Sequence, residues 1–505
     1  MILLVLLMQV QVDWRAWLYG MRPGRTLGAP GSESLIMTPE GFLLGVGHSR
    51  PYPDIHAVAW ALTPEGYTLW QFHQDTISYD FSVLIGSCAS SSGYLYAGGY
   101  AVPPGESSST LFVMRLDPGN GFPMWSYTLP DTAASGSWLF APDPNGNLVA
   151  CGDLWTPSTN IDIHAISLDT EGNLRWYFRY DGPDHEMDQV RDMGLDSNGN
   201  IYLAGVREDS TVSCTEIYPL VIKLDTAGNL LWINLLNPLD GYAGRNLALH
   251  GKWMYAAGSM EWGAGSYGAF VSRFDTAMGS VDWCKEYASS GWQFVNDMIM
   301  DENNNIYLAG EGGSGCWEVM CVDSLGNEKW RFEAEPGPLN DGMLVIKFDS
   351  PGNLLAGGAS RDGYPAVYKL DTLGNLIWSW KDTLTEYDDG TVSGLVPDGQ
   401  GGVYVQERFI GPDTGSPYYT NITSVVHLTE GQAIAEDGGK GQVLKVLMAQ
   451  SGFWVSGYEG EAQIYDPAGR LVISREIKGK TLMGPLSPGV YFVVAGKERA
   501  KVAVR

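Results

Sequence analysis

Acidic residues recur just before the first apolar run of several repeated segments, and carboxylates at such matched positions could bind a cation. The candidates are Asp80, Asp188, Asp297, Asp341 and Asp389. If these runs surround a common axis, the side chains line its mouth, where oxygen ligands would suit a hard ion such as calcium. The alternative is structural, because aspartate readily accepts hydrogen bonds from nearby backbone amides. We favour the structural use. Calcium is the one cofactor that the sequence suggests, and no organic cofactor is expected.

Three turns share the opening of a calcium-binding loop, with aspartate followed by asparagine at the third and fifth positions. They begin at Asp143, Asp196 and Asp301. None has the glycine at position six or the glutamate at position twelve that such loops need. A tight hairpin turn therefore explains these residues better than a metal site does.

Aromatic residues gather in the long, variable segments between apolar runs, where exposed rings could stack on sugars or anchor a protein partner. The candidates are Trp155, Trp262, Tyr267, Trp292, Trp317, Tyr418 and Tyr419. The alternative is that these rings cover the edges of neighbouring strands. Single surface aromatics are common in proteins, so this alternative carries the greater weight.

Sequence motifs of the common catalytic sites are absent. The chain has no Gly-x-Ser-x-Gly and no His-Glu-x-x-His, and its 7 histidines show no metal-binding spacing. The run 310–315 (GEGGSG) matches Gly-x-Gly-x-x-Gly, but no predicted helix follows it to bind a phosphate. Carboxylates are numerous, yet no spacing singles out a glycosidase pair. We name no catalytic residue, and a binding protein is favoured over an enzyme.

Two recurring sequence fragments identify the elements that must hold these residues. One is an Asp-x-x-Gly-Asn turn that leads into a short apolar run ending in glycine, as in 196–205 (DSNGNIYLAG). The other is Leu-Asp-Thr-x-Gly-Asn-Leu-x-Trp, as in 224–232. Its tryptophan recurs at an average spacing of about 52 residues, which indicates repeated supersecondary units. The repeat tryptophans, which we expect in the core, are Trp17, Trp70, Trp125, Trp176, Trp232, Trp283, Trp330 and Trp378.

Each repeat divides into four short runs rich in Val, Ile, Leu, Tyr and Trp, separated by Gly, Asn and Asp. Such runs predict strands, and the residues between them tolerate the positive φ of tight hairpins. No segment keeps a helical period, so the predicted fold class is all-β. Four antiparallel strands repeated around an axis predict an eight-bladed β-propeller, with seven blades as the alternative.

The two ends of the repeat region complement each other. The first tryptophan run, 14–19 (WRAWLY), stands alone, whereas the last repeat lacks its tryptophan run. We therefore predict that the N-terminal strand completes the last blade of a propeller over residues 13–435, which removes two exposed sheet edges. The alternative is that residues 433–436 fill the vacancy.

Charge separates the propeller region from the C-terminal tail. The chain carries a net charge of −27, yet basic residues outnumber acidic ones after the Gly-rich stretch 436–442, which we interpret as a linker. Strand and turn patterns over 443–505 predict a small β-sandwich domain. We expect so acidic a propeller to repel nucleic acid. We also expect a monomer.

Residues 1–12 begin with the apolar run MILLVLLM, which is too short to span a membrane. The run is similar to the core of a secretory signal, although a basic leader and an Ala-x-Ala site are missing. The alternative is a buried strand. We weigh export higher, and we expect no transmembrane anchor.

The tail resembles a type A sorting domain of the type IX secretion system. The resemblance rests on 464–466 (IYD), 469–470 (GR), 489–491 (GVY) and the basic end 501–505 (KVAVR). The Asn-Pro opening that is usual in that family is missing near 443–450. The resemblance implies delivery by the secretion machinery, with the protein secreted or held at the outer-membrane cell surface.

The repeats resemble bacterial SBBP-type β-propeller repeat proteins, through both recurring fragments over roughly 14–430. That resemblance implies an extracytoplasmic propeller. The tryptophan fragment also resembles the docking motif of eight-bladed quinoprotein dehydrogenases, but this chain lacks the adjacent cysteines of that family. We therefore predict an exported, non-catalytic propeller that binds a polymer (such as a polysaccharide) or a protein partner through its long-loop face. The alternative is a propeller enzyme, either quinoprotein-dehydrogenase-like or acting on polysaccharides.

Overall fold

The computed structural model describes most of the chain as strands and turns, with no helix among the described residues. These are residues 10–18, 21–23, 34–49, 55–74, 79–106, 108–129, 133–156, 160–210, 215–236, 244–261, 267–287, 294–312, 317–334, 343–360, 362–383, 389–412, 419–430, 445–449, 452–456, 460–465, 470–478, 481–483, 489–495 and 498–504. The chain divides into two compact units, one over Leu7–Gln432 and one that includes Ala433–Arg505.

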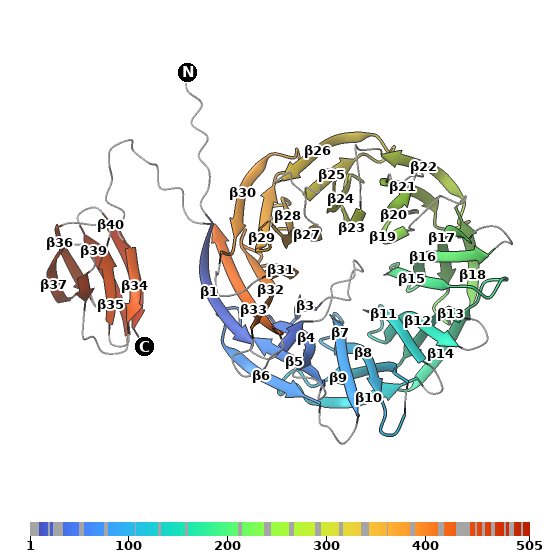
Figure 1. Ribbon diagram of the computed structural model, residues 1–505, viewed down its shortest axis with the longest axis horizontal. Helices are drawn as coiled ribbons and strands as arrows, with labels where there is room; N and C mark the ends of the chain where they lie inside the picture. The colour runs from blue at the N-terminus through green and yellow to red at the C-terminus, as the bar shows by residue number, and fades with distance from the viewer. Residues whose placement is uncertain are drawn as a thin grey trace. The chain divides into compact units, whose positions relative to one another are not determined.

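The first unit is a ring of eight antiparallel sheets, which confirms the eight-bladed β-propeller (Figure 1). The blades are numbered 1 to 8 by the chain order of their innermost strands. The innermost strands are β3 (Leu35–Met37), β7 (Phe81–Ala89), β11 (Ala133–Pro142), β15 (Asp188–Leu195), β19 (Gly244–His250), β23 (Phe294–Met300), β27 (Met343–Phe348) and β31 (Asp389–Pro397). The second strands are β4 (Leu43–Ser49), β8 (Leu95–Val102), β12 (Leu148–Thr156), β16 (Ile201–Ser210), β20 (Trp253–Glu261), β24 (Ile306–Glu311), β28 (Leu354–Ala359) and β32 (Val403–Pro412).

The outer half of each blade follows the same order. The third strands are β5 (Ala57–Leu62), β9 (Thr110–Leu116), β13 (Asn160–Leu168), β17 (Thr215–Leu224), β21 (Tyr267–Asp275), β25 (Trp317–Val322), β29 (Pro365–Leu370) and β33 (Tyr419–Glu430). The outer strands are β6 (Thr68–His73), β10 (Pro123–Thr128), β14 (Leu174–Tyr180), β18 (Leu230–Leu235), β22 (Val281–Tyr287), β26 (Glu328–Ala334), β30 (Leu376–Lys381) and β1 (Val10–Leu18). Blade 1 gains a fifth strand, β2 (Met21–Pro23), which pairs with β4.

Burial explains the apolar runs of the sequence. Strands β5 and β28 are buried at every position because both faces of a blade pack against neighbouring blades. The outer strand β6 instead alternates between exposed and buried residues over most of its length. Hydrophobic clusters span neighbouring blades, as where Leu44 of blade 1 packs in one cluster with Phe112 of blade 2.

Tryptophans on the outer strands join each blade to the next. In six blades the indole Nε1 donates a hydrogen bond of 2.9–3.3 Å to a backbone carbonyl in the turn between the third and outer strands of the following blade. The pairs are Trp14 with Pro64, Trp70 with Pro118, Trp125 with Thr170, Trp176 with Thr226, Trp232 with Thr276, and Trp330 with Thr372. Trp70 and Trp378 are buried, and the other described members of the predicted set are half-buried. The repeated motif thus supplies both halves of an inter-blade contact.

The N-terminal strand β1 pairs with β33 and completes blade 8, as predicted. The assignment of Trp17 to the repeat position in this strand was wrong. Trp14, and not Trp17, lies opposite the third strand just after a register shift, in the same way as Trp70 in blade 1. Because Trp14 also bonds to blade 1, the strand that completes blade 8 closes the ring. The side chain of Trp17 and residues 433–436 lie outside the described residues.

Register shifts in the inner strands place polar side chains between blades. The strand β15 shifts just before Asp192 and β23 just before Asp297. The Asp192 carboxylate accepts a hydrogen bond of 2.6 Å from the Leu247 amide of blade 5, and Asp297 accepts one of 2.8 Å from the Ile346 amide of blade 7. A bulge leaves backbone groups outside the ladder, and here side chains use this freedom to connect neighbouring blades.

The second unit consists of two small sheets, in agreement with the predicted small β domain. One contains β34 (Lys445–Ala449), β35 (Gly452–Ser456) and β38 (Thr481–Met483). The other contains β37 (Leu471–Ile477), β36 (Gly460–Tyr465), β39 (Gly489–Ala495) and β40 (Glu498–Val504). The expected linker 436–442 lies outside the described residues. The expected signal segment 1–12 does so up to residue 9, and residues 10–12 open β1.

Candidate functional site on the long-loop face

The long-loop face is the end of the ring at which second strands connect to third strands and the chain crosses to the next blade. In blade 3, β12 ends and β13 begins at this face, so that Trp155 pairs with Ile161 and Leu154 with Asp162. The strand β14 also ends at this face, and β15 of blade 4 begins there. Binding residues commonly lie on such connections above a rigid scaffold.

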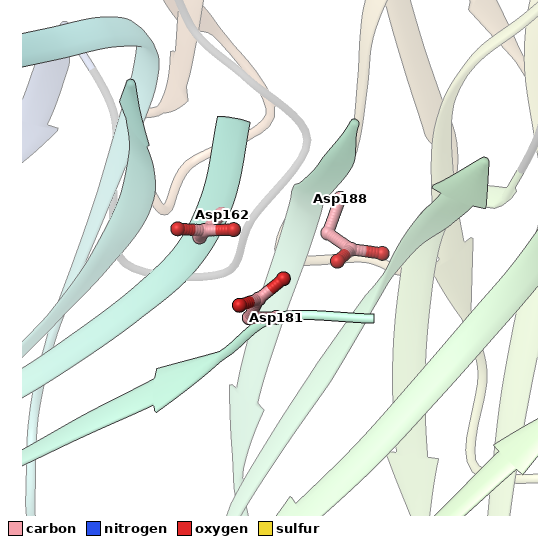
Figure 2. Close-up of side chains that lie close together, drawn as sticks. All are labelled: Asp162, Asp181 and Asp188. Carbon is pink, nitrogen blue, oxygen red and sulfur yellow. The ribbon is translucent and has the colours of Figure 1, made fainter. Parts of the chain in front are cut away.

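Three aspartates lie close together where the chain crosses from blade 3 to blade 4, and we call them the Asp cluster (Figure 2). Asp162 lies in β13, Asp181 directly follows β14, and Asp188 opens β15. One carboxylate oxygen from each residue lies within 4.8 Å of the other two. Asp162 and Asp188 are buried, whereas Asp181 is half-buried, so the cluster is reached from solvent on the Asp181 side.

Arg179, two residues before Asp181, is bonded to two members of the Asp cluster. Its Nε and Nη2 donate to Asp162 Oδ2 at 3.1 and 2.8 Å, and Nη2 lies 3.4 Å from Asp181 Oδ2. On the solvent side, His185 Nδ1 lies 2.9 Å from Asp181 Oδ1. One arginine therefore serves two carboxylates at once.

Asp188 is held differently from the other two aspartates. Its Oδ2 accepts a hydrogen bond of 2.5 Å from the Gly182 amide, while its Oδ1 is buried without a hydrogen-bond partner among the described residues. Burial raises the pKa of the Asp188 carboxyl to about 7. The Gly182 hydrogen bond and the Arg207 guanidinium lower this pKa, and the carboxylates of Asp162 and Asp181 raise it further.

Trp155 is the predicted ligand-binding aromatic whose placement is clearest. It lies next to the last residue of β12, and its side chain is 45% exposed. The residue beside it, Leu154, pairs with Asp162, so the exposed indole and the Asp cluster belong to the same edge of blade 3. Because successive residues of a strand point to opposite faces of the sheet, the indole and the Asp162 carboxylate share this end of blade 3 but lie on opposite faces.

The other predicted aromatics do not join Trp155 in the described structure. Trp317 opens β25 but is only 5% exposed, and its ring packs against Tyr368, so it serves the core and offers no open face. Tyr267 and Tyr419 open β21 and β33, with side chains outside the described residues. Trp262, Trp292 and Tyr418 lie wholly outside the described residues.

The predicted metal ligands are dispersed, apart from Asp188. Asp80 is exposed and accepts a hydrogen bond of 3.1 Å from the Gly105 amide. Asp297 is buried and accepts from Met298 and Ile346, both at 2.8 Å, which is the amide-bonding use favoured from the sequence. Asp341 and the side chain of Asp389 lie outside the described residues. Among the described residues, only Asp188 of the predicted set lies in a potential cation cluster.

The sequence did not predict Asp162 and Asp181 as neighbours of Asp188, because Asp162 lies in blade 3 and Asp181 directly follows its outer strand. A local signal for Asp162 does exist, since it is an acidic residue inside the run 161–166 (IDIHAI), which is apolar apart from Asp162 and His164. Asp181 gives a weaker signal, because it follows a tryptophan strand at an ordinary crossing. Neither position shows from the sequence that the three carboxylates meet.

A cavity of about 330 Å³ lies at the opposite end of the ring, where five consecutive inner strands lead into short turns. Its lining residues are Ile36, Met37, Cys88, Ala89, Pro142, Lys347, Leu395, Val396 and Pro397. Lys347 supplies the one charged group of this lining. Burial raises the pKa of the Cys88 thiol well above its ordinary value, so no reactive thiolate is available there. The candidate site is therefore the long-loop edge of blade 3.

Comparisons with known proteins concern the architecture. No family model matches the chain, and no curated protein matches it. A protein of unknown function from Bacteroides caccae is 13% identical over 55% of this chain and 90% of its own, with a TM-score of 0.32. PorZ, an essential bacterial surface component of the type IX secretion system of Porphyromonas gingivalis, is 12% identical over 94% of this chain and 70% of its own, with a TM-score of 0.35.

Structures of enzymes occur among the similar folds as well. Prolyl oligopeptidase B from Galerina marginata is 10% identical over 76% of this chain and 55% of its own, with a TM-score of 0.43. At these identities and TM-scores the similarities carry no functional argument. In the part of the chain that the structure describes, no helix has the length and apolar character that crossing a membrane would require.

Proposed function

We propose that this protein is an exported, non-catalytic β-propeller that binds a polymer or a protein partner through its long-loop face. The observation that carries the proposal is Trp155, a large aromatic side chain that is 45% exposed at the edge of a rigid blade. Aromatic rings that stand at such edges give large contact area at low entropic cost when a sugar ring or a partner side chain covers them. The net charge of −27 disfavours binding to nucleic acids, whose phosphates are also negatively charged.

Binding is tested with the full chain on arrays of bacterial and host polysaccharides and on pull-downs from outer-membrane fractions. The variant Trp155→Ala should lose at least about tenfold in affinity, the loss expected for a central aromatic anchor. The matched control is Tyr67→Ala, because Tyr67 is 55% exposed in a short turn at the opposite end of blade 1. Equal binding by both variants would refute the assignment of the long-loop face.

We also propose that residues 443–505 deliver the propeller to the cell surface through the type IX secretion machinery. Two small sheets, the second of which contains the basic last strand β40, support this proposal, together with the sorting-domain resemblance of the tail. A chain that ends at residue 432 should fold but stay in the periplasm of a host with this secretion system. Surface display of the shortened chain, measured by protease accessibility on intact cells, would contradict the proposal.

A further inference from the structure

We propose that the Asp cluster of Asp162, Asp181 and Asp188 binds one calcium ion, which ties blade 3 to blade 4. The proposal concerns cation binding at one edge of the ring. It holds or fails independently of whether the long-loop face binds a polymer.

The geometry of the donors suits a hard divalent cation. All three offer carboxylate oxygens, the ligand type that calcium prefers over softer metals. Calcium binds oxygen at about 2.3–2.6 Å, so two oxygens on one ion lie at most about 5 Å apart. The three carboxylate oxygens lie within 4.8 Å of one another and so meet this requirement. Figure 2 shows the carboxylates facing a common space from three separate segments of chain.

The charges in and around the cluster leave room for a divalent ion. The three carboxylates carry three negative charges, and Arg179 supplies one positive charge to two of them. The next arginine, Arg207, is already committed, because its Nε and Nη2 both donate to Asp209 at 2.7 Å. His185 adds a positive charge only when it is protonated, and it stands on the exposed side. At pH 8 two negative charges therefore remain to be balanced.

Asp188 gives the second, independent indication of a ligand. Its side chain is fully buried, and its Oδ1 has no hydrogen-bond partner among the described residues. A buried carboxylate oxygen is normally hydrogen-bonded or bound to a metal, because leaving it without a partner is unfavourable. A calcium ion between Asp188 and its two neighbours would supply the missing interaction.

Such an ion would join three separate segments of two neighbouring blades. Asp162 belongs to the third strand of blade 3, Asp181 to the crossing, and Asp188 to the inner strand of blade 4. A ligand that binds only the folded state stabilises that state by mass action. The cluster therefore predicts that calcium raises the thermal stability of the propeller.

The test uses the full chain after dialysis against a chelator, at pH 8. Titration calorimetry with calcium chloride should show one saturable site, and the melting temperature should rise with calcium concentration. Magnesium should bind more weakly because it demands tighter octahedral geometry. The absence of saturable calcium binding by the wild-type chain would overturn the proposal.

Two variants locate the site. Asp188→Asn keeps an oxygen for the Gly182 amide and should weaken calcium binding at least tenfold, and Asp181→Asn, at the more exposed position, should do the same with less risk to folding. The control is Asp282→Asn, because Asp282 also pairs with a single arginine, Arg273, but lies outside the cluster. Calcium affinities that are equal in the control and in Asp181→Asn would show that the ion binds elsewhere and would reject the proposal.

Discussion

The glycine of the turn between the third and outer strands of a blade meets two demands at a single position. Gly228 has a φ of +78°, a conformation that side chains with a Cβ rarely adopt. A Cβ at this residue would also lie 2.6 Å from the ring of Trp176, which bonds to the carbonyl of Thr226 in the same turn. The pairing recurs around the ring, as with Gly374 and Trp330. The turn is thus a socket for the indole of the preceding blade.

A comparison of two glycines separates these two demands. Gly352 has a φ of +89° with nothing near its Cβ position, so Gly352→Ala should cost about 1 kcal/mol, the ordinary penalty for positive φ. Gly228→Ala must in addition displace an indole, and we expect a total loss above about 2 kcal/mol. Denaturant midpoints of the two variants provide the measurement. Equal midpoints would show that the socket contributes nothing beyond turn geometry.

Asp153 offers a second prediction at the scale of a residue. It is fully buried in β12, where its Oδ1 accepts a hydrogen bond of 2.8 Å from the Val190 amide of blade 4. Burial raises the pKa of this carboxyl to about 8, although the Val190 bond and Arg191 act in the opposite direction. Blade 5 solves the same problem without a charge, since Ser259 accepts a hydrogen bond of 3.0 Å from the Val295 amide.

The sign of the pH effect follows from the raised pKa of Asp153. The folded state holds a proton that the unfolded state releases near pH 4, so the stability that this group contributes is fully present below pH 4 and is lost as the pH rises towards 8. The slope from this one group is at most about 1.4 kcal/mol per pH unit. Asp153→Ser should therefore gain stability relative to wild type between pH 5 and pH 8. Parallel melting-temperature profiles of the two proteins over this range would contradict the assignment.

The strand β1 shows how an element is fixed by one buried ion group. The Arg15 guanidinium donates to Glu407 Oε2 at 2.7 Å and to Ser424 Oγ at 3.0 Å, and it also pairs with Asp382 beyond β30. Burial raises the pKa of the Glu407 carboxyl well above its ordinary value, and Arg15 lowers it. One side chain thereby connects the closing strand to blades 7 and 8.

Arg15→Gln should destabilise the propeller strongly, because it leaves Glu407 buried without its cation. Removing one partner of a buried ion pair typically costs about 3–5 kcal/mol. The loss should be larger at pH 8 than at pH 5, where Glu407 can hold a proton instead. Lys381→Gln, which removes an exposed pair with Asp362, serves as the control and should change stability by less than about 1 kcal/mol. The measurement is the melting temperature of wild type and of both variants at pH 5 and pH 8.

At the same scale, the sequence predicts elements better than it predicts their neighbours. Turn glycines and tryptophans encode each blade within a window of about 52 residues, so strands and blade number can be inferred locally. Trp14 is harder, because the run 14–17 contains two tryptophans and the bulge that selects the first one depends on pairing with β33. The Asp cluster is harder again, since the stacking of blades 3 and 4 brings Asp162 to Asp188.

For the whole molecule, closure depends on β1 more than on any other strand of blade 8. It alone comes from the other end of the chain, pairing along β33 from Val10 to Leu18. It also carries both Trp14, which bonds to blade 1, and Arg15, which bonds to Glu407 and Asp382. Without it, β33 presents a free sheet edge, and blade 1 loses the indole that fills its turn beside Gly66.

A chain that lacks residues 1–18 should accordingly melt at a lower temperature and associate through the free edge of β33. A synthetic peptide of residues 10–18, added in excess, should bind that edge as an added strand and restore both the melting temperature and the monomer. The same peptide with Trp14→Ala and Arg15→Gln should restore neither, because backbone pairing would remain while the indole and ion contacts are lost. If the shortened chain melts like the full one, the ring is held by contacts between blades alone, and closure by β1 is dispensable.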